Sequence, residues 1–249
     1  MTPPALSVDG AASFQGRQVF APLHLEIEAA RWTCLLGPSG VGKTTILRLI
    51  AGLEDGCDFD GAITATDGEL VFNRVAYMAQ TDLLFPWLDV LGNTLLGARL
   101  RGERSDTARA EALIDRVGLS DDISKRPHQL SGGMRQRAAL ARTLMEDRPI
   151  ILLDEPFSAL DARTRVEMQD LAAELLSERT VLLVTHDPAE AARLGHRIHL
   201  MQSYGLVEVP PPSTVPIRAY DDPDVFACQS ELMRMLRSRD PLLAREGKD

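Results

Sequence analysis

The sequence predicts an α/β fold built on a mainly parallel sheet, and three observations favour it. A short apolar run, Trp32 to Leu36, leads into the glycine-rich segment GPSGVGKTT at residues 37–45 and then into a helical pattern. After Pro149, apolar strands alternate with helices, which is typical of a parallel sheet covered by helices. The run Ile150 to Leu153 is continuously apolar, as expected of a strand buried on both faces.

The first eighty residues are expected to form a small antiparallel β part, the first strand of the parallel sheet and one helix. Turn residues separate the apolar runs, and the stretch 55–70 is rich in Asp, Gly and Thr and shows no strand pattern. The expected elements are strands over 5–8, 19–25 and 32–36, a helix over 44–53, and a strand pattern over 70–78 that ends at Gln80.

Helical patterns dominate the middle of the chain, so an inserted helical subdomain is expected at about residues 82–147. The prolines at 210–212 end the main domain predicted over 1–209 and begin a short tail, 210–249, with one amphipathic helix. The expected elements are helices over 90–100, 106–117, 138–144, 163–176, 188–194 and 224–239, and strands over 181–185 and 198–201.

Composition excludes several classes of protein. The 249 residues are 45% hydrophobic and 25% charged, which is ordinary for a globular chain. A net charge of −9 provides no general basic field, so nucleic-acid binding is not expected. The three cysteines lack metal-type spacing, and no apolar run is long enough to span a bilayer. Any role at a membrane is therefore expected to depend on a partner.

The glycine-rich segment is predicted to bind a nucleoside triphosphate. Its glycines allow a concave backbone whose N–H groups point at phosphate oxygens, next to the positive end of a helix. Lys43 would reach the β and γ phosphates, Thr44 would offer its hydroxyl to Mg²⁺, and Thr45 would touch the α phosphate. A chance glycine turn before a helix is the alternative. The predicted ATP-binding residues are Gly37, Pro38, Ser39, Gly40, Val41, Gly42, Lys43, Thr44 and Thr45.

Two acids end the buried strand that starts at Ile150. Phosphoryl transfer needs a second metal anchor besides the loop threonine, and Asp154 is predicted to provide it. Glu155 follows directly and is placed to orient and deprotonate an attacking water. Two solvated acids that merely cap a strand are the alternative, which the preceding phosphate loop makes weaker.

A second candidate anion site lies at residues 131–133. Ser131 is a candidate helix N-cap followed by Gly132 and Gly133, which leave backbone N–H groups free at the start of a helix. A single lobe cannot easily bring this cap and the phosphate loop to one nucleotide, whereas two copies arranged head to tail can.

In this combination the residues resemble the ATP-binding subunits of ABC transporters, and the resemblance covers the chain to about residue 208. The resemblance implies an ABC-type P-loop NTPase fold, in which two subunits sandwich two ATP molecules between the Walker A loop of one chain and the signature of the other. The motifs appear in the family's order: Walker A at 37–44, the Q-loop at Gln80, the signature at 130–133, Walker B at 150–154 followed by Glu155, the D-loop at 158–161, and the switch histidine His186.

The resemblance also implies roles for residues that would carry little meaning alone. His186 would contact the γ phosphate, and Gln80 would touch Mg²⁺ or the water and relay motion to a membrane partner. Ser131 to Gly133 would act on the partner's ATP, and Asp161 of the D-loop is counted with the nucleotide site. Phe14, 29 residues before Lys43, would stack on adenine, although a core Phe is the alternative.

An apolar and aromatic segment follows Gln80 directly. We expect Gln80 to Leu88 to receive a coupling helix of a membrane permease, with a simple core for the helical lobe as the alternative. The string QTDLLFPWL at 80–88 resembles the nitrate, sulfonate, taurine and thiamine-precursor importers, and residues 77–80 and 96–102 their pyrimidine-precursor members.

The expected protein is thus a homodimeric ATPase subunit of a bacterial importer, cytoplasmic and peripheral on the inner face of the cell membrane, with a separate permease and a solute-binding protein. A cytosolic ABC ATPase without a transporter is a second hypothesis, but it typically carries long coiled coils or two nucleotide domains. A small-molecule kinase with a P-loop is a third, and it leaves Leu130 to Gly133 and His186 unexplained.

Overall fold

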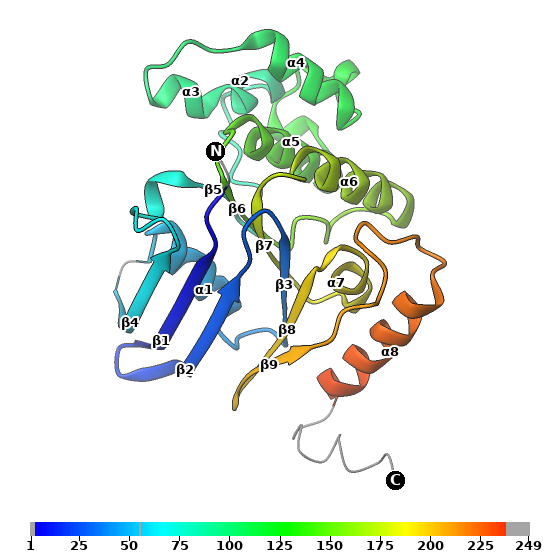
Figure 1. Ribbon diagram of the computed structural model, residues 1–249. Coiled ribbons are helices and arrows are strands. Elements are labelled where there is room, and N and C mark those ends of the chain that lie inside the picture. Colours follow the sequence, from blue (N-terminus) through cyan, green and yellow to red (C-terminus); the bar gives the residue numbers. More distant parts are fainter. Residues whose placement is uncertain (1–2, 55, 238–249) are drawn as a thin grey trace.

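The computed structural model describes residues 3–54 and 56–237, and a six-stranded sheet forms its centre (Figure 1). Five strands run parallel, while the last pairs antiparallel with its neighbour, so the predicted mainly parallel sheet is confirmed. The strand order is β5-β6-β7-β3-β8-β9. The strands are β3 (Trp32–Leu36), β5 (Val75–Met78), β6 (Ile150–Asp154), β7 (Thr180–Thr185), β8 (Arg197–Gln202) and β9 (Gly205–Val209).

The N-terminal part is an antiparallel sheet in the order β2-β1-β4, as the fold class predicts. Its strands are β1 (Leu6–Phe14), β2 (Arg17–Ile27) and β4 (Cys57–Ala65). Strand β4 was not expected, because residues 55–70 show no strand pattern in the sequence. This strand lies at the sheet edge and exposes Asp58 and Asp60, so it lacks the apolar run that marks a buried strand.

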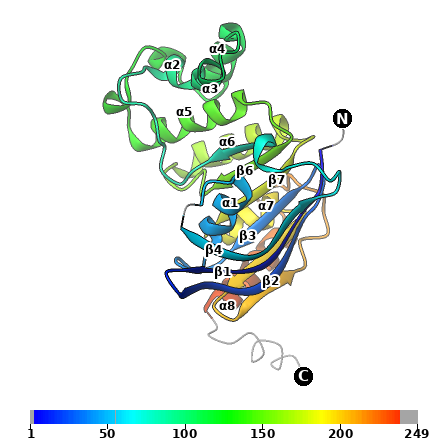
Figure 2. The ribbon, with the colours of Figure 1, turned by 90° about the vertical axis from the view of Figure 1, so that its left-hand side faces the viewer.

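Four α-helices lie between β5 and β6 in the chain and form the layer at the top of Figure 1, which Figure 2 shows from the side. They are α2 (Val90–Thr94), α3 (Leu96–Leu100), α4 (Thr107–Arg116) and α5 (Gly132–Met145). The single helix expected over 90–100 is divided at Leu95, and glycines 92 and 97 lower helix propensity on both sides of the break. The boundaries of the helical subdomain stay a prediction.

Two cores cover the two faces of the central sheet. Successive residues of β3 alternate between them: Cys34 and Leu36 face one core, and Leu35 faces the other. Helix α1 (Lys43–Ala51) packs with the antiparallel sheet on the Leu35 side. The opposite core holds side chains of α5, α6 (Ala162–Leu175), α7 (Pro188–Leu194) and α8 (Pro223–Arg237).

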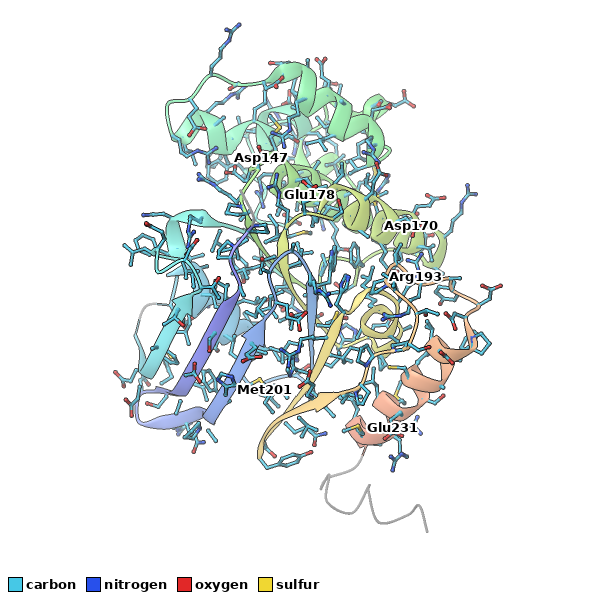
Figure 3. The ribbon with its side chains drawn as sticks, in the orientation of Figure 1. Asp147, Asp170, Glu178, Arg193, Met201 and Glu231 are labelled. Atoms are coloured by element: carbon cyan, nitrogen blue, oxygen red, sulfur yellow. The ribbon has the colours of Figure 1, made fainter. Side chains whose placement is uncertain are left out.

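The segment after the prolines at 210–212 folds back onto α7. Arg218 is buried and its Nη1 donates to the carbonyl oxygens of Ala192 and Gly195, both at 2.8 Å. Arg193 donates to the Arg218 carbonyl at 3.1 Å and to Asp170 at 2.5 Å, and Figure 3 labels both side chains of the latter pair. Helix α8 therefore joins the main core. The last two residues of the helix expected over 224–239 lie outside the described residues.

Candidate functional site

The phosphate loop follows β3 and is shaped by two glycines. A Cβ on Gly37 would lie 2.2 Å from the carbonyl oxygen of Met201, which is labelled on β8 in Figure 3, so no other residue fits there. Gly42 has φ +104 and caps α1 without any side-chain hydrogen bond. The first N–H groups of α1 therefore have no side-chain cap and face the loop, which suits an anionic ligand.

Lys43 is folded over this loop. Its side chain is buried, and Nζ donates to the carbonyl oxygens of Gly37 at 2.7 Å and Pro38 at 2.9 Å. Burial lowers the pKa of Lys43, while the charges of Glu155 and Asp154 act in the opposite direction. The ammonium of Lys43 therefore lies near the carboxylates of Asp154 and Glu155. The phosphate loop and the end of β6 thus form one site.

Asp154 ends β6 and is almost completely buried. Burial raises the pKa of its carboxyl, and the hydrogen bond from the Thr44 side chain acts against that shift. Tyr77 on β5 also donates to Asp154, over 3.4 Å, a contact that the sequence analysis missed. Because β5 and β6 are parallel neighbours, their carboxyl ends meet, and a polar residue near the end of β5 was the available signal.

The fit of Mg²⁺ rests on Thr44 and Asp154, whose hydrogen bond brings a hydroxyl and a buried carboxylate to one point. Mg²⁺ usually keeps several waters and takes only one or two carboxylates beside substrate phosphates. No cluster of three or more His, Cys, Asp or Glu residues suited to a metal occurs in the described part of the chain, and this donor set needs none.

Three predicted catalytic residues meet at one carboxylate oxygen. Gln80 Nε2 donates to Glu155 Oε2 at 3.2 Å, and His186 Nδ1 lies 3.0 Å from the same atom. Glu155 has φ +49, in the left-handed region that a non-glycine residue seldom adopts, and its N–H donates to the Val184 carbonyl at 2.9 Å. Gln80 and His186 therefore both contact the carboxylate of Glu155, the residue nominated to activate the water.

Other predicted residues lie apart from this group. Ser131 caps α5 by accepting from the Met134 N–H, and Asp161 caps α6 by accepting from the Thr164 N–H. No hydrogen bond or ion pair among the described residues joins Ser131, Gly132 or Gly133 to the phosphate loop of the same chain. Phe14 ends β1 with 43% of its surface exposed, which argues against the core alternative. Its contact with adenine stays a prediction.

Glu190 is a buried carboxyl that the sequence analysis did not single out. It accepts a hydrogen bond from Thr185 Oγ1 at 2.7 Å, and the same oxygen of Thr185 accepts from the Asp187 N–H at 3.0 Å. These contacts brace the backbone on both sides of His186. Burial raises the pKa of Glu190 to about 7, and the Thr185 hydrogen bond opposes that shift.

Glu190 is expected to make the folded chain less stable as pH rises. Its folded-state pKa is above the unfolded value, so the folded state binds more protons between about pH 4.5 and 7 and loses stability through that window. Between pH 5 and pH 8 this lowers the free energy of unfolding by about 2–3 kcal/mol, a change that Glu190→Gln should abolish. Urea unfolding at both pH values measures the difference. The exposed Glu178→Gln is the control, and equal pH dependence in wild type and Glu190→Gln would contradict this role.

Comparison with known proteins places this geometry in a family. The profile of the ABC transporter family matches residues 20–158, which is more than half of the chain. An uncharacterized ABC transporter ATP-binding protein of Haemophilus influenzae is 46% identical over 78% of this chain and 80% of its own length. The aliphatic sulfonates import ATP-binding protein SsuB 1 of Rhodococcus jostii is 42% identical over 93% of this chain and 92% of its own.

Solved structures agree with the sequence relatives. The ATP-binding cassette MJ0796, a dimer in a post-hydrolysis state with ADP and Pi, is 26% identical and superimposes with a TM-score of 0.73 over 86% of this chain and 99% of its own. An ATP-bound bacterial Atm1-family ABC exporter gives 26% identity and a TM-score of 0.72 over 83% of this chain and 38% of its own. The chain therefore belongs to the ABC transporter family, as an ATPase of its ATP-binding type.

Proposed function

We propose that the chain is the ATP-hydrolysing subunit of an importer and works on a separate membrane permease. Support comes from relatives named for aliphatic sulfonate import, which this chain matches over about nine-tenths of its length. No helix in residues 3–54 and 56–237 combines the length and apolar character needed to cross a bilayer. Attachment to the inner face of the membrane would then go through the permease.

The proposed nucleotide site uses the residues that meet at the end of β6. The loop from Gly37 to Thr45 would cradle the phosphates of ATP, with Lys43 on the β and γ groups. Thr44, Asp154 and Gln80 would hold Mg²⁺, which when bound neutralises phosphate charge. Glu155 would accept the proton of the attacking water, since its carboxylate is already fixed by Gln80 and His186.

The observation that carries a two-chain site is the separation of the two anion-binding ends within one chain. Ser131 to Gly133 make no hydrogen bond or ion pair with Gly37 to Thr45 among the described residues, although each end suits a phosphate. A second copy of the chain, related by two-fold symmetry, would bring its cap to the first copy's ATP. The dimeric state of the structural relative supports this arrangement.

The proposed permease contact is the segment Gln80 to Leu88, which is exposed or half-buried except at Leu84. Leu83 is 60% and Trp87 65% exposed, and the rings of Phe85 and Trp87 pack with centroids 5.0 Å apart. Buried Asn93 donates to the carbonyl oxygens of Phe85 and Leu88 at 3.2 Å, which fixes the loop from inside. An apolar surface on a braced loop suits an amphipathic helix of a partner.

Replacing both Phe85 and Trp87 by Ala should weaken capture of the permease by about tenfold or more, because aromatic anchors dominate such interfaces. Hydrolysis by the isolated chain should change little, because no hydrogen bond or ion pair among the described residues joins either side chain to Asp154 or Glu155. Co-purification from membranes and solute uptake are the measurements. The control is Phe226→Ala, an exposed aromatic on α8. Unchanged capture and uptake in the double variant would contradict the docking surface.

We propose a sulfonate as the solute. The sequence leaves several anions and pyrimidine precursors open, and the relatives named for aliphatic sulfonate import favour the sulfonate among them. The solute would never touch this chain, so the test uses the cognate solute-binding protein screened against alkanesulfonates, taurine, nitrate and a pyrimidine precursor. Binding of none of the sulfonates would overturn this choice of solute. Absence of the chain from membranes that contain the permease would favour the non-transport ATPase instead.

A further inference from the structure

The buried amide of Gln136 connects helix α5 with the loop at residues 155–159. Gln136 on α5 is 7% exposed, and its Nε2 donates to the carbonyl oxygen of Glu155 at 2.9 Å and to Ser158 Oγ at 3.3 Å. Its Oε1 accepts from the N–H of Ala159 at 2.8 Å. The side chain of Gln136 therefore links helix α5 by hydrogen bonds to the loop that carries Glu155.

The bond to Glu155 bears on the direction of its carboxylate. With φ at +49, this residue needs its surroundings to hold the backbone. Its carbonyl accepts from Gln136 and from Ser158 Oγ at 3.0 Å, while its N–H donates to Val184. The side chain of Glu155 starts from the Cα between this N–H and this carbonyl. The bonds that fix these two backbone groups therefore also fix the direction in which the carboxylate approaches Gln80.

The start of α5 lies against the same loop. Ser131 caps the helix, and Gln136 follows within two turns, so the cap and the amide belong to one continuous helical segment. A Cβ on Gly133 would lie 3.3 Å from the Ala159 carbonyl oxygen, which leaves the helix start little freedom to shift without moving the loop. A displacement of this helix start would therefore also move the backbone of Glu155.

We propose that Gln136 is a positioning residue that couples the two ATP sites of the dimer. When the cap of one chain engages the partner's ATP, Gln136 orients that chain's own Glu155 toward its own ATP. Hydrolysis at each site then depends on occupancy of the other. The inference rests on the proposed two-chain site. Only in that arrangement do Ser131 to Gly133 contact the partner's ATP while Glu155 of the same chain acts on the chain's own ATP.

The test compares two variants with a matched control. Gln136→Glu keeps an acceptor for the Ala159 N–H but cannot donate to the Glu155 carbonyl, and Gln136→Met loses all three bonds. Gln169→Met removes another buried glutamine, on α6, whose amide oxygen accepts from Arg193 and not from this loop. Urea unfolding reports stability, and steady-state hydrolysis against ATP concentration gives kcat, half-saturation and the Hill coefficient.

Gln136→Glu should lower kcat about tenfold or more, change half-saturation by less than about twofold, and reduce a Hill coefficient above one to one. Gln136→Met should do the same, while Gln169→Met keeps wild-type cooperativity. Wild-type kinetics in Gln136→Glu, a wild-type Hill coefficient of one, or failure of Gln136→Glu to fold would overturn the proposal. A chain with Glu155→Gln that stays monomeric with ATP would instead refute the two-chain site itself.

Discussion

Glu155→Gln should slow ATP hydrolysis by at least about a hundredfold while ATP binding persists, the size of effect expected when a general base is lost. The amide is nearly isosteric and can stay beside Gln80 and His186, but it cannot accept the proton of the attacking water. Lys43 and the phosphate loop are unchanged, so ATP should remain bound and hold two chains together. Phosphate release and gel filtration with ATP are the measurements.

The matched control for this variant is Glu178→Gln, an exposed glutamate near the end of α6 (Figure 3). It should hydrolyse ATP at the wild-type rate. A Glu155→Gln chain that hydrolyses ATP normally would remove Glu155 from the reaction. A slow chain that nevertheless remains monomeric with ATP would retain the base and contradict the two-chain site.

Lys43→Ala should weaken ATP binding by roughly ten- to a hundredfold, the equivalent of about 1.5–3 kcal/mol for charge-assisted hydrogen bonds. The side chain is held in the loop by the carbonyl groups of Gly37 and Pro38, so its ammonium lies where the phosphates are expected. Hydrolysis should fall further, because charge developing on the γ phosphate loses its nearest cation.

Titration with a fluorescent ATP analogue measures this loss. Lys125→Ala is the control, since Lys125 is exposed and pairs with Asp122 away from the loop. Unaltered nucleotide affinity in Lys43→Ala would show that the phosphates bind elsewhere.

Much of the fold followed from local sequence patterns. Buried parallel strands such as 150–154 are continuous apolar runs, and their position between helices predicts the sheet. Strand β4 was missed because an edge strand with aspartates facing solvent has no such run. Strand β9, also unpredicted, owes its conformation to antiparallel pairing with β8, a contact between neighbours that apolar periodicity does not encode.

The residues of the candidate site likewise fall into those that a local sequence motif predicts and those that it does not. Residues nominated from a local motif, such as Lys43 and Glu155, were predicted from spacing, and in the structure the charge of Glu155 acts on Lys43. Their roles in the reaction stay predictions. Tyr77, Gln136 and Glu190 escaped because their partners are distant in sequence or their burial is decided by packing. A glutamine within the apolar stripe of α5 was a signal, since a buried amide requires partners.

The central claim is that each ATP is held by two copies of the chain. The most direct measurement is a structure of Glu155→Gln with ATP and Mg²⁺. We expect Ser131 to Gly133 of one copy to lie within hydrogen-bonding distance of the γ phosphate that residues 37–45 of the other copy bind. An ATP molecule bound by a single chain, with no contact from a second copy's cap, would contradict it.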